Sequence, residues 1–435
     1  MLVSKFGGTS MANASTICQV ADIILSNPER KYIVVSAPGK REKDDIKVTD
    51  LLYKCFDEAA QNGNCAKSFA LVRARFDDII RDLNIDLDLS ADFDEIEKKI
   101  NSSTSPDYAA SRGEYLSAKI LAKKLGFDFL DSAEFIKFNN ERFQFHYSLD
   151  LLRAVLEEHP YAVIPGFYGS NAEGEIKTFS RGGSDISGAV VARAADARIY
   201  ENWTDVNGFM SADPRIVENP RHIENLSYRE LRELSYMGAN VLHPESIFPV
   251  RSVGIPINIK NTFEPNHKGT FIMPDNLVPE NDNIITGIAG KKGFTIILVE
   301  KSMMNAEVGF CRKVLSVLEY ENISFEHIPS GIDTLCVVVG DEAIQGKMQK
   351  VVDKIKESVC ADSVEIHSGI SLIATVGHNM AARLGTAATL FSALAKANVN
   401  IRMIDQGSSE LNIIVGIDTP NYEKAINAVY SAFKK

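Results

Sequence analysis

The sequence predicts an α/β protein in which a layered αβα sandwich is followed by two small α+β modules. Through about residue 275, short apolar strands alternate with amphipathic helical segments, as in sheets that helices cover on both faces. A stretch rich in Pro and Asn, residues 264–283, then interrupts the alternation and is the predicted boundary. Beyond it, residues 308–331 align without gaps on residues 384–407, which indicates an internal repeat.

The elements of the sandwich follow from local patterns. Near-continuous apolar runs predict buried strands at 31–37, 161–166, 197–203 and 255–260. Amphipathic spacing predicts helices at 49–61, 66–82, 111–125, 148–159, 184–195 and 227–237. In the repeat, each copy reads as a glycine, a helix that ends at Asn322 or Asn398, and then two strands. Two tandem α+β modules are therefore expected.

Composition narrows the class of protein. The net charge of −11 argues against nucleic acid or an anionic membrane as the main partner. No apolar run reaches the ~18 residues of a membrane span, and the N-terminus lacks the pattern of a signal peptide. The 6 cysteines show no C-x-x-C pair, so we expect reduced, mostly buried thiols in a cytoplasmic protein. An anionic small molecule would then need a local positive site.

The stretch KFGGTS places Lys5 at a strand end, directly before two glycines and a helix. A strand, a glycine turn and a helix N-terminus form a nest of backbone N–H groups that binds anions, and Lys5 would add a charge to it. The lysine precedes the glycines, so the pattern is not a P-loop. The structural alternative is a solvent-facing Lys5 and a helix capped by Ser10 or Asn13.

Three further stretches allow a structural and a functional interpretation. Ser36 follows a strand, at the edge where open α/β sheets bind ligands, but this is also a common strand exit. Thr49 is either a helix N-cap or a hydroxyl donor. In SRGE, Glu114 either completes a capping box with Ser111 or receives a substrate ammonium group.

The stretch SRGGSD places Arg181 before two glycines and the start of a helix. Ser184 or Asp185 could cap that helix, but capping requires neither the arginine nor the glycines. A guanidinium at this position is suited to hold a carboxylate through two parallel hydrogen bonds. In WTDVNGFMSADPR, Asp205 and Arg215 lie in a loop-rich stretch, which favours contacts to a nucleotide or its metal.

Together these stretches resemble the aspartokinases of the amino acid kinase superfamily. The resemblance covers nearly the whole chain, and the repeat resembles two ACT modules, which bind amino acids as regulators. It implies a three-layer αβα kinase domain at 1–275, a ferredoxin-like ACT module at 284–365 and a second at 366–435 that also recruits about 284–299. The motifs, in order, are KFGGTS, VVSAPGK, VTDLL, SRGE, SRGGSD, TDVNGFMSADPR, GANVLHPE and NIRMIDQGSSELN.

The resemblance implies transfer of the γ-phosphoryl group of ATP to the side-chain carboxylate of L-aspartate, the first step of lysine, threonine and methionine biosynthesis. It implies ATP and Mg²⁺ as cofactors, with no side chain assigned as a metal ligand. The implied catalytic residues are Lys5, Arg181 and Asp185. The implied ATP-binding residues are Lys5, Gly7, Gly8, Thr9, Ser10, Ser36, Thr204, Asp205, Met210 and Arg215. The implied aspartate-binding residues are Thr49, Glu114, Arg181, Gly182, Gly183, Ser184 and Asp185.

Elementary chemistry agrees with this implication. A carboxylate is already nucleophilic, so alignment and cancellation of charge suffice for catalysis. Two positions depart from the family pattern. Many members have lysine where Asn240 stands and tyrosine where Met210 stands. The first change puts a phosphate contact in doubt, and the second removes stacking on adenine.

The resemblance also implies regulation. We expect feedback inhibition by L-lysine, with L-threonine or both effectors together as alternatives, and a homodimer or dimer of dimers formed through the ACT modules. The candidate effector residues are Met304, Gly309, Phe310, Phe325, Glu326, Ser330 and Asp333. Two other functions stay open at this point. One is a related kinase acting on glutamate, carbamate or a nucleotide, and the other is a non-catalytic amino-acid sensor.

Overall fold

The computed structural model of the chain describes residues 1–102, 105–180, 182–239, 241–242, 244–381 and 383–434. The chain divides into two compact units. The larger unit comprises Met1–Phe209, Glu224–Tyr228 and Asn240–Pro279. The smaller unit comprises Met210–Ile223, Arg229–Ala239 and Glu280–Lys435. The predicted α/β class is confirmed.

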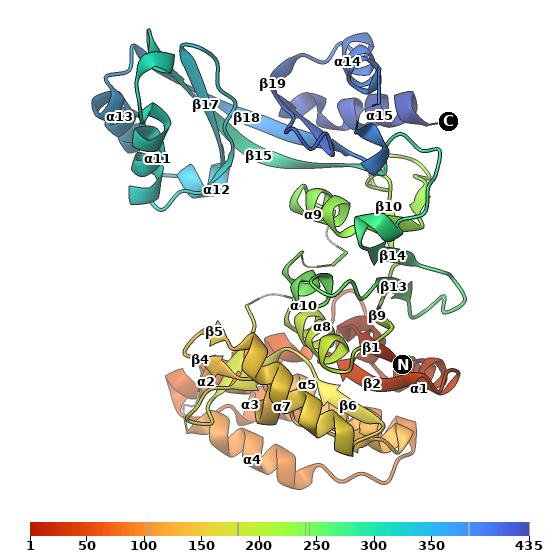
Figure 1. Cartoon of the computed structure of the whole chain (residues 1–435). Coiled ribbons are helices and arrows are strands. Elements are labelled where there is room, and N and C mark those ends of the chain that lie inside the picture. Colours follow the sequence, from red (N-terminus) through yellow and green to blue (C-terminus); the bar gives the residue numbers. More distant parts are fainter. Residues whose placement is uncertain (103–104, 181, 240, 243, 382, 435) are drawn as a thin grey trace. The chain divides into compact units, whose positions relative to one another are not determined.

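An eight-stranded sheet forms the centre of the larger unit (Figure 1). All neighbouring strands are parallel except β13 and β14, which pair antiparallel. In spatial order the strands are β12 (Asn225–Ser227), β14 (Thr270–Met273), β13 (Ile257–Asn261), β9 (Ile199–Thr204), β1 (Leu2–Phe6), β2 (Arg30–Val35), β6 (Ala162–Pro165) and β3 (Asp128–Phe129). The four predicted strands are β2, β6, β9 and β13, each within a few residues of its expected bounds.

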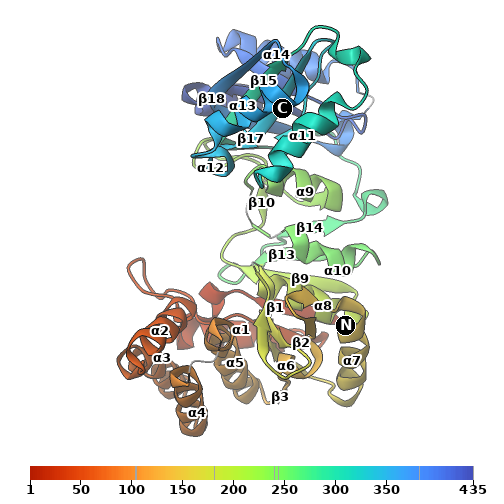
Figure 2. The same ribbon diagram turned by 90° about the vertical axis from the view of Figure 1, so that its left-hand side faces the viewer.

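Helices cover both faces of this sheet, which gives the predicted αβα layers (Figure 2). One layer contains α1 (Ala14–Leu25), α2 (Val48–Asn62), α3 (Ala66–Leu83), α4 (Ser90–Asn101) and α5 (Pro106–Leu125). The other contains α7 (Phe145–Glu158), α8 (Gly183–Ala194) and α10 (Phe248–Arg251). Shorter elements complete the unit: α6 (Ser132–Phe135) and the hairpins β4 (Phe138–Asn139)–β5 (Arg142–Phe143) and β7 (Tyr168–Ser170)–β8 (Ile176–Thr178).

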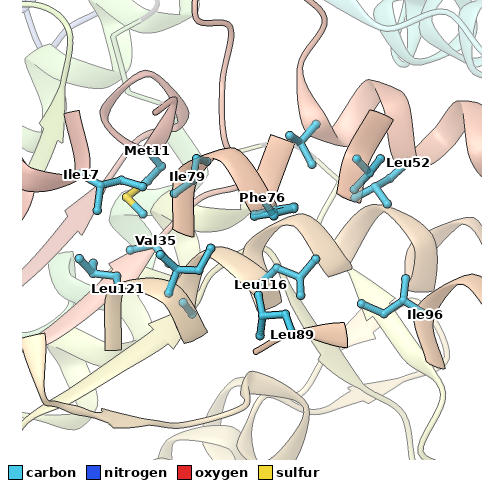
Figure 3. Packing of buried hydrophobic residues seen from close by; sticks show 14 of the residues in the cluster. Met11, Ile17, Val35, Leu52, Phe76, Ile79, Leu89, Ile96, Leu116 and Leu121 are labelled. Carbon is cyan, nitrogen blue, oxygen red and sulfur yellow. The ribbon is translucent and has the colours of Figure 1, made fainter. Parts of the chain in front are cut away.

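The largest apolar cluster lies between the sheet and the first helical layer (Figure 3). Its side chains come from β1, β2 and all five helices of that layer, including Val35, Leu52, Phe76 and Leu116. Amphipathic spacing in the sequence produced these buried faces, because apolar residues three and four apart share one side of a helix. The cluster therefore holds the loops that follow β1 and β2 on a rigid support.

Three predicted helix starts differ from the structure. Helix α5 begins at Pro106 with Ser105 as its N-cap, so SRGE lies inside the helix and its capping-box interpretation is wrong. Lys47, not Thr49, is the N-cap of α2. Gly182, in a left-handed conformation, precedes α8, so neither Ser184 nor Asp185 is a cap. In α1, however, Asn13 caps the helix and forms a capping box with Thr16, as one of the two expected candidates.

A six-stranded antiparallel sheet forms the smaller unit, in the order β16 (Phe325–His327), β17 (Thr334–Gly340), β15 (Gly287–Glu300), β18 (Ser363–Val376), β20 (Asn412–Asp418) and β19 (Ile401–Asp405). The long strands β15 and β18 run through the whole sheet. The second half of β15 pairs with β17, and the second half of β18 pairs with β20. One half of the sheet packs against α11 (Phe310–Tyr320) and α13 (Met348–Val359). The other half packs against α14 (Thr386–Lys396) and α15 (Tyr422–Phe433).

The internal repeat is confirmed in detail. Gly309 and Gly385 precede α11 and α14 with φ of 84° and 86°. Asn322 and Asn398 follow these helices with φ of 54° and 51°. Glycine and asparagine are the residues that adopt this left-handed conformation at least cost, which explains why both copies carry them.

The remaining elements are β10 (Phe209–Met210), β11 (His222–Ile223), α9 (Tyr228–Tyr236), α12 (Asp341–Ile344) and the 3₁₀ helices η1 (Gly8–Met11), η2 (Pro244–Ile247), η3 (Asp275–Leu277), η4 (Met304–Ala306), η5 (His378–Met380) and η6 (Thr419–Asn421). Among the described residues, no helix is both long and apolar enough to cross a membrane. All 6 cysteines are free thiols, but only Cys55 and Cys65 are buried. The expectation that most are buried is wrong.

Candidate active site

The register of the central strands brings three loops together at one edge of the sheet. Phe6 at the end of β1 lies opposite Val35 at the end of β2 and Trp203 near the end of β9. The backbone N–H of Gly166, just after β6, also donates to the carbonyl of Val35. The segments that follow these parallel strands therefore leave the sheet side by side. This is the edge at which open α/β sheets bind ligands.

The glycines of KFGGTS permit a close backbone contact with the loop after β2. The Gly39 N–H donates to the Gly8 carbonyl over 2.8 Å, and a Cβ on Gly39 would lie only 2.8 Å from that carbonyl carbon. A Cβ on Gly8 would lie 3.0 Å from the Ala37 carbonyl oxygen. Larger residues at Gly8 or Gly39 would separate the two loops, so the glycines are needed for this approach.

The neighbouring hydroxyls point in different directions. Thr9 Oγ1 donates to Asp205 Oδ2 over 3.1 Å, which links the loop after β1 to the loop after β9. Ser10, in contrast, is fully buried, and its hydroxyl is 2.7 Å from Thr262 Oγ1. Ser10 therefore stabilises the loop through a buried hydrogen bond and does not face solvent.

Lys5 is a buried cation that forms an ion pair with Asp185. Its Nζ lies 2.7 Å from Asp185 Oδ1, and Asn202 Nδ2 donates to the same oxygen over 2.9 Å. Only 8% of Lys5 is exposed, so the expected alternative of a solvent-facing lysine is wrong. A Cβ on Gly7 would lie 3.6 Å from Lys5 Nζ, so the ammonium group sits beside the glycine loop. Among the described residues Asp185 is its one ion-pair partner, so the ammonium group has donors left for an anion.

Glu114 is the second buried ionisable group at this edge. Its side chain is 5% exposed, and among the described residues Oε2 has no hydrogen-bond partner. Burial raises the pKa of Glu114 to about 8, against the smaller lowering effects of backbone N–H groups, Arg112 and Lys5. A buried carboxyl with an open oxygen is ready to receive a hydrogen-bond donor or a cation.

These loops surround a cavity of about 660 Å³. Six of the predicted site residues line it: Gly8, Thr9, Ser36, Thr49, Glu114 and Asp205. The rest of the lining comes from the loop after β2, including Lys40, Arg41, Lys43 and Lys47. These four cations outnumber the three acidic residues of the lining, Glu42, Glu114 and Asp205.

The basic residues of that loop were missed by the sequence analysis, although they follow SAPG directly in the run KREKDDIK. Arg75 on α3 holds this loop in place through hydrogen bonds. Arg75 is 4% exposed; its Nη2 bonds Asp45 Oδ2 over 2.5 Å and the Ile46 carbonyl over 3.2 Å. Its Nη1 lies 3.4 Å from the carbonyls of Ala12 and Gly39. One guanidinium thus links the loops after β1 and β2. The sequence around Arg75 gives no signal of this role, because Arg75 lies more than 25 residues from the loops that it contacts.

The remaining predicted residues are placed as follows. Gly183 and Ser184 lie in the first turn of α8, where a Cβ on Gly166 would be 2.8 Å from Ser184 Cβ. Thr204 ends β9 and donates to Asp205 Oδ1 over 3.3 Å. Met210 and Arg215 belong to the smaller unit, and Arg215 pairs with Asp213. Arg181 and Asn240 lie outside the described residues.

The candidate effector residues lie in the half of the smaller unit that contains α11 and α13. Met304 and Phe310 are buried in its apolar core, 6% and 3% exposed. Gly309 precedes α11, Glu326 accepts a hydrogen bond from Tyr236, and Asp333 Oδ1 accepts one from the Met303 N–H over 2.8 Å. Phe325, Ser330 and Asp333 are exposed. The structure therefore leaves the polar members of the set accessible and packs two apolar members inward.

Known proteins resemble this chain in sequence and in fold. Residues 1–261 match the amino acid kinase family, and residues 373–433 match an ACT domain. The chain is 36% identical to aspartokinase 3 of Bacillus subtilis, over 100% of this chain and 98% of that protein. The crystal structure of Clostridium acetobutylicum aspartate kinase matches with 51% identity and a TM-score of 0.94, covering 100% of both chains. E. coli aspartokinase III, in complex with lysine and aspartate, matches with 25% identity and a TM-score of 0.75, again over 100% of both chains.

The chain belongs to the amino acid kinase family and, within it, to the aspartokinases. It is an ATP-dependent kinase that acts on aspartate and carries an ACT regulatory domain. The family and the fold class expected from the motifs are confirmed.

Proposed function

We propose that phosphoryl transfer takes place in the cavity at the ends of β1, β2 and β9. The observation that carries the proposal is the position of Lys5, a buried cation held by Asp185 beside the glycine loop. An oxygen of the aspartate side chain would attack the γ-phosphorus of ATP while the bond to the bridging oxygen breaks and ADP leaves. Both reactants are anions, so a fixed cation lowers the barrier more than a general base would.

The two substrates would use different parts of the site. Lys5, the backbone around Gly7, Gly8 and Thr9, and Ser36 would surround the phosphates. Ser10 would act only by holding this loop, because its hydroxyl is buried against Thr262. Thr49, Glu114, Arg181 and the residues from Gly182 to Asp185 would hold aspartate. Within that set Glu114 would receive the ammonium group, for which its open oxygen is suited, and Arg181 would bind a carboxylate.

On the nucleotide side we keep Thr204, Asp205, Met210 and Arg215 as proposed contacts. Mg²⁺ bound together with ATP would supply positive charge that offsets the charge of the phosphates during transfer. The part of the chain that the structure describes contains no cluster of three or more metal-binding side chains. Asp205 lines the cavity and would offer a carboxylate to a phosphate-bound ion.

The lysines of the loop after β2 extend this proposal. Lys40, Lys43 and Lys47 line the same cavity as Ser36 and are exposed, so they can turn toward a bound polyphosphate. Lysine is a compact, mobile charge suited to phosphate. We propose that they attract the nucleotide and that Arg75 keeps their loop at the cavity.

A hydroxylamine trap tests the reaction and its site together. Acyl phosphate formed from ATP and aspartate converts to a hydroxamate that is measured by colour. We expect hydroxamate with aspartate, none with glutamate, and a loss of at least ~100-fold in Lys5→Ala. Activity with glutamate alone would favour another kinase of the superfamily, and no product with either would favour an amino-acid sensor.

For regulation, we propose a kinase domain at 1–275 and ACT modules at 284–365 and 366–435, the second sharing about 284–299. The continuous strand β15, which pairs with strands of both halves of the sheet, supports this nested division. We propose L-lysine as the feedback effector, since a related enzyme has been solved with lysine and aspartate. L-Threonine remains the second candidate effector.

We further propose a homodimer or dimer of dimers assembled through the ACT modules. Val308 and Leu384 occupy equivalent positions before the two module helices and are 97% and 98% exposed. Aliphatic side chains so fully exposed at both equivalent positions favour a protein interface. Because ATP and free aspartate are cytoplasmic metabolites, we place the enzyme in the cytoplasm, at the first step of lysine, threonine and methionine biosynthesis.

A further inference from the structure

The larger unit contains a second cavity, of about 460 Å³, apart from the active site. It lies between α4, α5 and the β7–β8 hairpin, and it shares no lining residue with the active-site cavity. Arg112 lines the second cavity, and Glu114, two residues further along α5, lines the first. The same helix therefore contributes a charged side chain to each cavity.

Arg112 is buried inside this second cavity and held in place by aromatic rings. It is 6% exposed, and its Cζ lies 4.8, 4.7 and 5.0 Å from the ring centres of Tyr108, Tyr115 and Tyr168. Its Nε and Nη2 both donate to Ser111 Oγ, over 3.0 and 2.9 Å. The rings orient the guanidinium, and its remaining N–H groups have room to bind an anion.

No carboxylate lies within ion-pair distance of Arg112 among the described residues. The nearest acidic groups on α4 are engaged elsewhere: Asp92 with Lys119 over 2.5 Å and Glu95 with Lys99 over 2.6 Å. Buried cations are normally paired, because removing a charge from water without a counter-charge is costly. The cavity therefore presents a prepared site for an anionic group.

Two other lining residues, Asp131 and Glu175, carry the complementary charge. Asp131 accepts hydrogen bonds from the Tyr168 hydroxyl and the Ala133 N–H, and Glu175 accepts one from Asn171 Nδ2 over 2.9 Å. Neither carboxylate has a cationic partner in the described parts of the chain. Ile96 and Ile176 add apolar surface to the lining of the cavity. A ligand with one carboxylate, one ammonium group and an apolar remainder matches this lining.

We propose that this cavity binds a free α-amino acid with an uncharged side chain. Its carboxylate contacts Arg112, its ammonium group contacts Glu175, and its side chain contacts Ile96 and Ile176. The four acidic residues of the lining disfavour an acidic side chain, which separates this ligand from the substrate aspartate. The site lies in the larger unit, so it is distinct from the sites proposed in the smaller unit.

Calorimetric titration of the full-length enzyme tests this assignment, using the neutral L-amino acids one at a time without ATP. We expect at least one of them to bind, and to bind roughly 10- to 100-fold more weakly to Arg112→Met, the usual loss for a hydrogen bond to a charged group. The amide of that amino acid lacks the carboxylate and its N-acetyl form lacks the ammonium group, so both should bind as weakly. Arg81→Met, which removes an exposed arginine on α3, is the matched control and should bind as the wild type does.

Glu175→Gln provides a second variant in a surface hairpin, should the loss of Arg112 unfold the protein. We expect the same weakening there, with an unchanged melting temperature. Crystals soaked in the binding amino acid should show it between Arg112 and Glu175. Equal affinities for every neutral amino acid in wild type, Arg112→Met and Glu175→Gln, or density for the ligand only in the smaller unit, would overturn the proposal.

Discussion

At the scale of single residues, the proposed active site contains two buried ionisable groups whose environments differ. Lys5 has a carboxylate partner, Asp185, which in turn accepts from Asn202. Glu114 has an open oxygen and a raised pKa. Lys5 therefore has a counter-charge in the protein, whereas Glu114 has none among the described residues. This difference suits a site that must bind two kinds of group. The cation would bind the phosphates, and the carboxyl group would bind the ammonium group of the substrate.

Replacing Lys5 by alanine should lower kcat at least ~100-fold, because a preorganised charge at the transferring phosphoryl group is lost. The melting temperature should change far less than the activity does. Steady-state kinetics on wild type and Lys5→Ala measures this. Lys54→Ala on α2, whose exposed ammonium pairs with Glu58 over 3.7 Å, is the control and should keep normal turnover. Normal turnover in Lys5→Ala would remove the proposed role.

Aspartate binding near pH 7 should release a proton from Glu114. Its pKa of about 8 means that the carboxyl is largely protonated in the free enzyme, and an incoming ammonium group favours the ionised form. Calorimetry in two buffers of different ionisation enthalpy counts the released protons. We expect a fraction of a proton approaching one in wild type and none from this group in Glu114→Gln. Identical proton counts in both proteins would contradict the assignment.

The raised pKa of Glu114 also makes the free energy of unfolding depend on pH. The folded state binds this proton up to about pH 8, whereas the unfolded carboxyl loses it near its ordinary value of 4.5. The folded state therefore holds more protons between these values, and the free energy of unfolding should fall as pH rises through that window. Denaturant titrations of wild type and Glu114→Gln at several pH values should differ in slope there. Parallel pH profiles would count against the buried, protonated state.

At the scale of elements, the site is assembled by strand ends and held by one helix. The sequence indicated which strands carry polar residues at their ends, because near-continuous apolar runs stop directly before KFGG, SAPG and WTD. It misplaced the starts of α2, α5 and α8, because Thr, Ser and Asp are frequent at caps and also inside first turns. The true start of α5 at Pro106 is what puts Glu114 in the helix interior.

Arg75→Met should lower kcat/KM roughly 10- to 100-fold, since the loop after β2 would lose its attachment and its residues would shift relative to the substrates. Arg75 joins Asp45, Ile46, Ala12 and Gly39, so no single other contact replaces it. The measurement is steady-state kinetics at a temperature where circular dichroism shows the variant folded. Arg81→Met changes an exposed residue on the same helix and should retain wild-type kinetics. A folded Arg75→Met enzyme with normal kinetics would show that the loop needs no such anchor.

At the scale of the whole molecule, the repeat and the order of motifs were readable from the sequence, and the contacts between distant residues were not. Matching glycines and asparagines at one offset predicted two similar modules, because those residues serve a left-handed backbone in both. The rings that enclose Arg112, in contrast, come from α5 and from β7, more than 50 residues apart. Only the fold brings such residues together, so no spacing rule could have found them.

Inhibition by L-lysine should become weaker in Asp333→Asn, with the concentration for half-inhibition rising roughly 10-fold, because a charged hydrogen-bond partner of the effector is lost. Asp333 is an exposed member of the candidate set. Asp353→Asn on α13, which removes an exposed carboxylate of the same module, should leave the inhibition curve unchanged. Activity curves against lysine and threonine decide the effector. Complete insensitivity of the wild type to both would end this part of the proposal.

The most direct test of the central claim is a crystal structure of the enzyme with L-aspartate and a non-hydrolysable ATP analogue. We expect the terminal phosphate of the analogue to contact Lys5 Nζ, and the ammonium group of aspartate to contact Glu114, with the aspartate side-chain carboxylate directed at that phosphate. Density that placed either ligand away from the loops after β1 and β2, with Lys5 bound only to Asp185, would contradict the account.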